Sequence, residues 1–179
     1  MKDAVPVPAA SAKVERLFIK PNGGVPNHPR LPALLYPGAV DRDARLEAVK
    51  ALCVSNGWSG LWDWTVFDFH HFHPASHEAL IVVAGHATLD LGGPDGATRE
   101  VTAGDALILP AGFGHRRAEG SGDFRVVGAY PKGQESPEVL RADVEAAKAV
   151  KTSIAATPIP NRDPVFGRDG PLIAVWGAA

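Results

Sequence analysis

The sequence has a single cysteine and no long apolar run, and each absence excludes a class of protein. The one cysteine, Cys53, excludes an internal disulfide framework and a cysteine-based zinc cluster, and it fits a reducing compartment. No stretch approaches the roughly 18 apolar residues of a membrane span, and the N-terminal residues lack an apolar run of signal-peptide length. We therefore expect a cytoplasmic protein without a membrane partner.

An excess of positive charge is also missing. The chain has 18 lysines and arginines against 20 aspartates and glutamates, so its net charge is −2. No basic face is present that would neutralise a phosphate backbone, and nucleic acid is not an expected partner. The 179 residues can enclose one hydrophobic core, and the 19 glycines and 16 prolines are spread between apolar segments. This favours one domain built of many short elements.

The N-terminal third is predicted to contain an arm and a helix. Residues 1–16 are expected to form a flexible arm, and residues 17–179 a single domain. A helix is expected within 41–57, because apolar residues recur there at helical spacing, Asp41 can cap the first turn and Gly57 provides the stop.

The core of the domain is expected at about 58–131, where the pattern changes to short apolar or alternating runs. These runs predict β-strands, and they are LWDWTVFDF, EALIVVA, ATLDL, ALILP and DFRVVGAY. The tract GGPDG between two of them is typical of a hairpin loop. A helix is expected at 136–150, with Ser136 as N-cap and Pro137 at the first helical position, before a final strand at 172–176. The periodicity therefore predicts an all-β sandwich or small barrel with a few helices.

Histidines are concentrated in one short segment. Four of the seven lie between residues 70 and 77, directly before the run EALIVV. On one strand, His71 and His73 would point to the same face with Cα atoms about 6.5–7 Å apart, from which two imidazoles can converge on one ion. The next strand can add either His77 or Glu78 but hardly both, because neighbours on a strand face opposite sides. His115 follows a tight bend about forty residues later and can complete the site.

The spacing of these residues resembles the two sequence motifs of the cupin family. The first motif is Gly, five residues, His-x-His, three or four residues, Glu, six residues and Gly, and its matches here are His71, His73, Glu78 and Gly85. The second motif is Gly, five residues, Pro-x-Gly, two residues, His, three residues and Asn, and its matches are Gly104, Pro110, Gly112 and His115.

Two positions depart from the family pattern. The leading Gly of the first motif is replaced by Thr65, and the closing Asn of the second by Glu119. Neither position is a metal ligand in the family, so the four ligand positions stay intact. The family's third ligand stands seven residues before the last Gly of the first motif, which gives Glu78. Some cupins use a shorter gap with histidine in that place, which would put His77 on the metal instead.

The resemblance extends beyond the motifs to a group of bacterial single-domain cupins, the YjlB-like proteins. The matching stretches are LPALLYPGAV, FDFHHFHPASHEALIVVAGHATLDLGG, GHRR, DFRVVGAYPKG and DPVFGRDGPL. This resemblance implies the cupin double-stranded β-helix, a jelly-roll barrel with a few flanking helices. It also implies a homodimer, since single-domain cupins commonly pair through their outer strands.

The resemblance implies one divalent metal ion per chain, held by His71, His73, Glu78 and His115, with His77 as the alternative to Glu78. Ligation by nitrogen and oxygen without thiolate fits Fe, Mn, Ni or Zn. Such a site leaves positions open for a small-molecule substrate or ligand. We therefore expect a metal-dependent oxidoreductase of the dioxygenase type, with Glu78 as the catalytic base. The alternatives are a metal-dependent isomerase or decarboxylase of a sugar or small acid, and a non-enzymatic cupin that binds a small ligand.

Residues outside the motifs provide the expected substrate contacts. Phe113, on the bend before His115, is placed to touch a ligand. In the pair Arg116 and Arg117, one side chain could aim at the barrel mouth and hold a carboxylate, and Arg116 is our candidate. The aromatic residues at 58–69 could wall a substrate pocket, but they are interpreted as core except at the barrel mouth. The remaining histidines are interpreted as surface or supporting residues.

Overall fold

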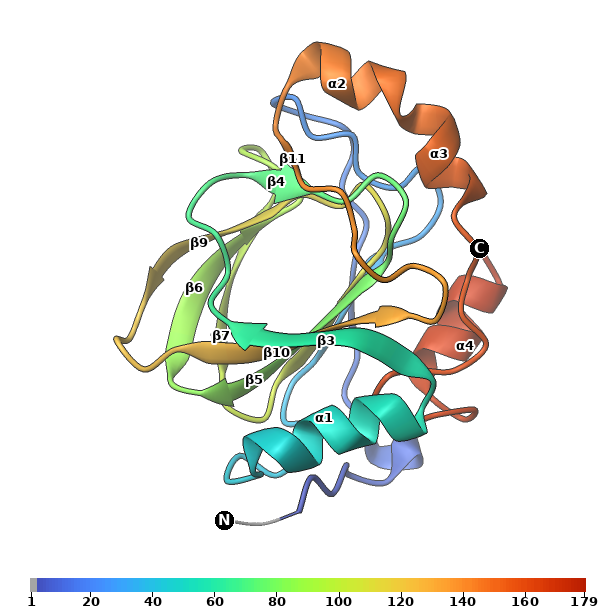
Figure 1. The fold of residues 1–179 in the computed structure, drawn as a ribbon. Helices are drawn as coiled ribbons and strands as arrows, with labels where there is room; N and C mark the ends of the chain where they lie inside the picture. The colour runs from blue at the N-terminus through green and yellow to red at the C-terminus, as the bar shows by residue number, and fades with distance from the viewer. Residues whose placement is uncertain (1–2) are drawn as a thin grey trace.

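The structure is a computed structural model that describes residues 3–179, and it consists of two antiparallel sheets with helices outside them (Figure 1). The strands are β1 (Glu15–Leu17), β2 (Ala33–Tyr36), β3 (Trp58–Trp64), β4 (His71–Phe72), β5 (Glu78–Ala84), β6 (His86–Leu91), β7 (Ala97–Thr102), β8 (Ala106–Leu109), β9 (His115–Gly120), β10 (Arg125–Pro131) and β11 (Leu140–Arg141). The helices are the 3-10 helix η1 (Ala9–Ser11), α1 (Leu46–Ser55), α2 (Val144–Ala149), α3 (Lys151–Ala156) and α4 (Pro171–Gly177).

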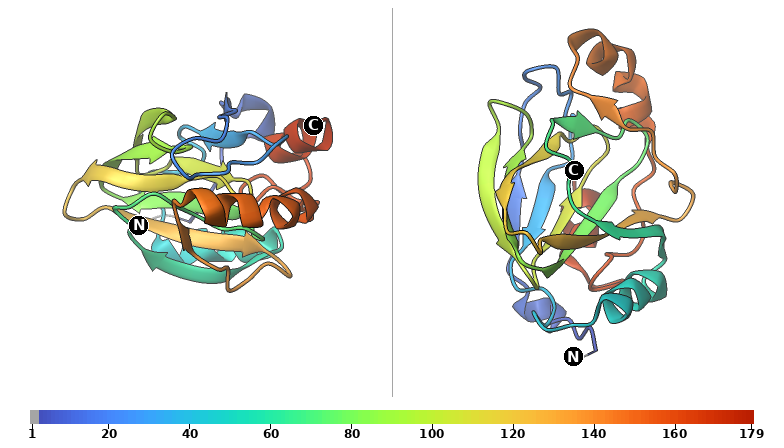
Figure 2. Two further views of the ribbon diagram at one scale, coloured as in Figure 1. Left: turned by 90° about the horizontal axis from the view of Figure 1, so that it is seen from above. Right: turned by 60° about the vertical axis from the view of Figure 1, so that its left-hand side comes forward.

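The two sheets curve around a common interior, which Figure 2 shows from two further sides. One sheet has six strands in the order β1-β2-β8-β5-β10-β3, and the other has five in the order β11-β4-β9-β6-β7. Strands β6 and β7 pair along their whole length around the GGPDG tract, which confirms the predicted hairpin. The fold is therefore the predicted all-β jelly roll with a few flanking helices.

The middle strands of the six-stranded sheet are buried on both faces. On β5, Leu80 packs inside the barrel, whereas its neighbour Ile81 belongs to a second cluster on the outer face of the sheet. That outer cluster includes Cys53 of α1 and Trp176 of α4, so these two helices cover the sheet from outside. Burial on both faces explains why the run EALIVVA is almost continuously apolar rather than alternating.

The helix predicted at 136–150 is wrong in its first half. Ser136 has a φ of 61°, a left-handed conformation that does not lead into a helix. The chain then forms β11, and α2 begins only after Asp143, whose carboxylate accepts a hydrogen bond of 2.8 Å from the Ala146 N–H. The segment before Asp143 is used instead as an edge strand that pairs with β4.

The final strand predicted at 172–176 is also wrong, because this segment is helix α4. Its buried residues, Leu172, Val175 and Trp176, recur at helical spacing, and Pro171 stands at the start of the helix. A run of five apolar residues does not by itself distinguish a buried strand from a buried helix. The segment packs on the barrel, as predicted, but in another conformation.

The N-terminal region differs from the prediction in two details. Helix α1 begins at Leu46 with Arg45 at its N-cap, so Asp41 does not cap it; the Asp41 carboxylate accepts a hydrogen bond from the Asp43 N–H in the preceding turn. Part of the predicted arm is joined to the body of the protein, because the Val7 N–H donates to the Ala39 carbonyl at 3.0 Å and β1 pairs with β2. Residues 1–2 of the arm lie outside the described part. Within residues 3–179, none of the helices has the length and apolar character needed to cross a membrane.

Candidate metal centre

Two neighbouring strands bring the rings of His71 and His115 close together. His71 begins β4 and His115 begins β9, and the two residues are direct partners in the antiparallel pairing of these strands. Their ring centroids lie 4.1 Å apart. His73 follows two positions after His71, and the ligand atoms of the three histidines all lie within 4.8 Å of one another. All three side chains are buried, so the five-stranded sheet delivers three imidazoles to one point inside the barrel.

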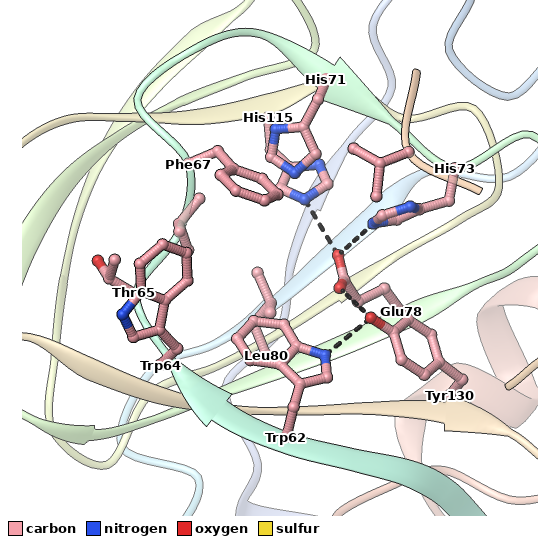
Figure 3. A pocket seen from close by; sticks show the side chains of 12 residues that line it. Trp62, Trp64, Thr65, Phe67, His71, His73, Glu78, Leu80, His115 and Tyr130 are labelled. Atoms are coloured by element: carbon pink, nitrogen blue, oxygen red, sulfur yellow. Dashed lines mark hydrogen bonds and ion pairs between the residues drawn. The ribbon is translucent and has the colours of Figure 1, made fainter. Parts of the chain in front are cut away.

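Glu78 reaches the same point from the opposite sheet. It begins β5, and its carboxylate is buried. The Oε2 atom lies 3.0 Å from His115 Nε2 and 3.3 Å from His73 Nε2 (Figure 3). The structure therefore brings together the four residues named from the sequence, and we refer to His71, His73, Glu78 and His115 as the four-residue cluster.

Backbone carbonyls fix the tautomer of all three imidazoles. The Nδ1 atoms hydrogen-bond to carbonyl oxygens, at 3.0 Å for His71 with Phe69, 2.9 Å for His73 with Glu138 and 3.1 Å for His115 with Phe113. A carbonyl oxygen only accepts, so each Nδ1 carries the proton. In the neutral ring Nε2 is then a lone pair, and these lone pairs face the centre of the cluster.

The charges of the cluster are set by burial and by mutual contact. Burial, followed by the nearby His115 ring, lowers the pKa of His71 to about 3, so this ring is neutral. Burial also opposes protonation of His73, but the Glu78 carboxylate overrides it and raises the pKa of His73. Burial would raise the pKa of Glu78, yet the contacts with His73 and His115 hold it well below its usual range. Glu78 is therefore an anion deep inside the barrel.

The cluster fits a divalent cation. His73 Nε2 and Glu78 Oε2 are buried and make no hydrogen bond within residues 3–179, although they face each other at 3.3 Å. A cation that accepts a lone pair from each would satisfy both atoms. Three imidazoles held through Nδ1 and one carboxylate also match the arrangement in which outer hydrogen bonds orient metal ligands. The residues present therefore fit the ion that the sequence motifs imply.

His77, the alternative to Glu78, points away from the cluster. Its Nδ1 accepts a hydrogen bond of 2.9 Å from the Ala111 N–H, and its ring packs against Trp176 of α4 at a centroid distance of 4.9 Å. Burial, followed by the charge of His28, lowers the pKa of His77 to about 3, so this ring is a neutral part of the core. The opposite facing of neighbours on β5 therefore places Glu78 in the cluster and His77 behind it.

A tyrosine and a tryptophan that sequence reasoning missed hold Glu78 in place. The Tyr130 hydroxyl donates to Glu78 Oε1 at 3.0 Å, and Trp62 Nε1–H donates to the Tyr130 oxygen at 2.7 Å (Figure 3). Burial, together with the Glu78 carboxylate, raises the pKa of Tyr130, which keeps its proton. Because Oε1 is occupied, only Oε2 faces the imidazoles. Both residues lie in predicted strands, but no sequence signal distinguishes them from ordinary core aromatics.

Phenylalanine in place of Tyr130 is expected to weaken metal binding about 10- to 100-fold, the usual effect of removing a group that orients a metal ligand. The change deletes only the hydroxyl that holds Glu78 Oε1. Isothermal titration with Zn²⁺ measures the affinity. Tyr36→Phe is the matched control, since it deletes the hydroxyl of the other tyrosine. That hydroxyl donates to Asp163 with a distance of 2.7 Å and does not contact the cluster. Equal affinities in the two variants would remove Tyr130 from the site.

A cavity of about 140 Å³ adjoins the four-residue cluster. Apart from the cluster itself, its walls are mostly aromatic and aliphatic, and they comprise Trp62, Trp64, Thr65, Val66, Phe67, Leu80, Tyr130 and Val139. Trp64, Phe67 and Val139 are also exposed to solvent, so they form the mouth of the cavity. The cavity can take a small molecule that carries few polar groups besides those that reach the cluster.

The two residues named as substrate contacts lie elsewhere. Phe113 is buried in the core inside the barrel and does not line the cavity; its contribution is the carbonyl that orients His115. Arg116 does not line the cavity either, and its guanidinium is paired with Asp90 at 2.8 Å. Among the remaining histidines, the buried His28 accepts hydrogen bonds from two N–H groups of its own turn, and His86 is exposed on β6.

Comparison with known sequences identifies relatives of the chain. The sequence pattern of the family described as "Cupin domain" matches residues 65–130, which contain the four-residue cluster. The chain is 35% identical over 164 residues to "Uncharacterized protein YjlB" of Bacillus subtilis (strain 168), and the match covers 92% of this chain and 97% of the relative.

Solved structures with a similar fold include proteins whose names give different activities. Acireductone dioxygenase from Bacillus anthracis, with a cadmium ion in its active centre, is 19% identical over 47% of this chain and 56% of that chain, with a TM-score of 0.34. A putative mannose-6-phosphate isomerase from Ralstonia eutropha JMP134 is 21% identical over 71% of this chain and 91% of that chain, with a TM-score of 0.31. At TM-scores this low, neither likeness carries an argument about the reaction.

Proposed function

The chain belongs to the cupin family, in its YjlB-like group, and on this premise we propose that it is a metal-dependent oxidoreductase of the dioxygenase type. The substrate is a small molecule that carries adjacent oxygen atoms. The ion is held by the four-residue cluster, and its mixed nitrogen and oxygen ligands suit Fe, Mn, Ni or Zn. When bound, the ion would supply a Lewis acid with open coordination positions and, as Fe²⁺, the electrons that oxygen chemistry requires.

The apolar character of the cavity is the observation that carries this proposal. A sugar isomerase must satisfy every hydroxyl of its substrate, because a polar group buried without a partner is costly. Beyond the cluster, this cavity offers few side chains with hydrogen-bonding atoms, chiefly Thr65 and Tyr130. A small molecule that is mostly apolar and binds through the metal centre fits these walls better than a sugar does. Dioxygenation is also balanced in atoms and electrons, since both atoms of O₂ enter the product and no external reductant is needed.

The residues of the chain have separate roles in this proposal. Glu78 Oε2, once released from the ion, is the oxygen that can accept a proton from the substrate, while Tyr130 holds Oε1 and so keeps the carboxylate turned toward the histidines. Trp62 orients Tyr130. The aromatic walls exclude water from the reacting atoms and contact the carbon skeleton of the substrate.

Oxygen uptake by the Fe²⁺-loaded protein is expected with at least one member of a panel of diketones, catechols and thiols. One O₂ should disappear for each substrate molecule consumed, as measured with an oxygen electrode and product analysis. At equal iron content, Glu78→Gln is expected to lower the rate at least 100-fold, the lower range of a general-base contribution. Equal turnover with and without air would contradict the proposal and favour an isomerase or decarboxylase. Absence of turnover, with an unchanged melting temperature after chelation, would favour a non-enzymatic binding protein.

A further inference from the structure

The two adjacent arginines of β9 face opposite sides of their sheet. Arg116 pairs across the strands with Asp90 and forms an ion pair with it at 2.8 Å. Arg117 pairs with Leu89, which is buried inside the barrel, and it stands two residues after His115 on the same strand. Residues two apart share a face, with Cα atoms about 6.5–7 Å from each other. Arg117 therefore extends the row of inward-facing side chains that begins with a member of the four-residue cluster.

Arg117 is bound to the wall of the metal-centre cavity. Its Nη1 donates to Thr65 Oγ1 at 3.0 Å, and its backbone N–H donates to the Phe67 carbonyl at 2.8 Å. Thr65 and Phe67 both line that cavity, and Figure 3 shows Thr65 beside Trp64 at one end of it. The guanidinium does not itself line the cavity, and it reaches the cavity wall through its hydrogen bond to Thr65.

A second hollow of about 360 Å³ lies on the other side of this wall. Trp64 and Thr65 line both spaces, so these two residues form the wall that the hollow and the cavity share. Arg117 and Arg125 supply the positive charges of its lining. The outer space therefore has charged side chains in its lining, where the walls of the inner one beyond the cluster are mostly apolar.

The guanidinium of Arg117 is free to bind an anion. Arg125 is already paired with Asp63. Asp123 is the acidic residue of the hollow, and its Oδ1 lies beside Gly85. Within residues 3–179, Arg117 forms no ion pair with any carboxylate, and its only side-chain hydrogen bond goes to the neutral Thr65. A half-buried guanidinium has five N–H donors, so most of them are left for a ligand.

We propose that Arg117 binds a carboxylate of the substrate, so that the site accepts small carboxylic acids whose other oxygens reach the metal centre. This inference rests on the proposed function. The planar fork of a guanidinium matches the two oxygens of a carboxylate, which makes arginine the side chain suited to this contact. In this arrangement the aromatic walls of the cavity contact the short carbon skeleton. Arg116, which was the candidate from the sequence, is already paired with Asp90 on the other face of the sheet.

Matched acids and amides test the inference on the Zn²⁺-loaded protein. Pyruvate is compared with pyruvamide, and salicylate with salicylamide, by isothermal titration. The wild type is expected to bind the acid of at least one pair about tenfold more tightly than its amide, as the loss of one charged hydrogen-bonded contact would predict. Arg117→Gln should lose this preference, and Arg116→Gln, the matched control, should keep it. Arg117→Lys, which keeps the charge without the fork, should keep a weaker preference.

Three outcomes overturn the inference. They are a wild type that binds neither acid better than its amide, an Arg117→Gln variant that keeps the preference, and a preference that the lysine replacement leaves unchanged. If the glutamine variant does not fold, as judged by its melting curve, the comparison with Arg117→Lys decides the test. Zinc does not support oxygen chemistry, so the binding test does not depend on oxygen uptake. The acid preference can fail while oxygen uptake succeeds, and oxygen uptake can fail while the acid preference is present. The two results therefore separate this inference from the proposed function.

Discussion

Alanine in place of His115 is expected to leave less than a tenth of the wild-type metal content in protein purified without added metal. Loss of a group behind a ligand already weakens metal binding about 10- to 100-fold, so loss of a ligand itself should exceed that range. His115 Nε2 also lies 3.0 Å from Glu78 Oε2, which would then keep only its contact with His73. Elemental analysis of the purified protein, repeated for His71→Ala, measures the effect.

His77→Ala is the matched control for this experiment. It removes a fully buried imidazole from the same segment, together with the acceptor for the Ala111 N–H, and should lower the melting temperature without lowering the metal content. Glu78→Ala should behave like His115→Ala. If Glu78→Ala keeps its metal while His77→Ala loses it, the choice of Glu78 is wrong. Wild-type metal content in all of these variants would contradict the metal centre altogether.

The sequence predicts the convergence of the three histidines because two simple regularities act together. The period of two on a strand places His71 and His73 on one face, and the bend at 110–114 delivers His115 to the next strand. The choice between His77 and Glu78 does not follow from spacing, because it depends on which face of β5 turns inward. That direction is set by the pairing of Glu78 with Leu109 on β8 and by the packing of His77 under α4.

Other parts of the site depend on contacts that no local pattern reveals. Tyr130 reaches Glu78, and Trp62 reaches Tyr130, only because β10 lies between β5 and β3 in the sheet. The sequence presents Arg116 and Arg117 as equivalent, and the register of β9 against β6 separates them. The wrong C-terminal predictions have the same origin, since α4 and β11 take their form from the surfaces they cover, and a short apolar or charged run is compatible with either state.

Alanine at Gly128 is expected to destabilise the protein by about 1–3 kcal/mol and to disturb the metal centre at the same time. Gly128 lies on β10 opposite Trp62 on β3, and the register between these strands shifts just after it. A Cβ at this glycine would lie 2.0 Å from Cε2 of the Trp62 ring, so the indole must move. Its hydrogen bond to Tyr130 would then be lost, and Tyr130 would hold Glu78 less firmly.

Urea denaturation and Zn²⁺ titration measure the two effects of Gly128→Ala separately. Gly122→Ala is the matched control, because an added Cβ there meets no atom within 4 Å, and it should change the free energy of unfolding by no more than about 0.5 kcal/mol. Adding Trp62→Leu to Gly128→Ala removes the ring that the new methyl group meets. The double variant should therefore regain stability relative to the sum of the single changes, yet still bind metal weakly, because the donor to Tyr130 is absent. Wild-type zinc affinity in Gly128→Ala would mean that Glu78 is held without the help of Trp62.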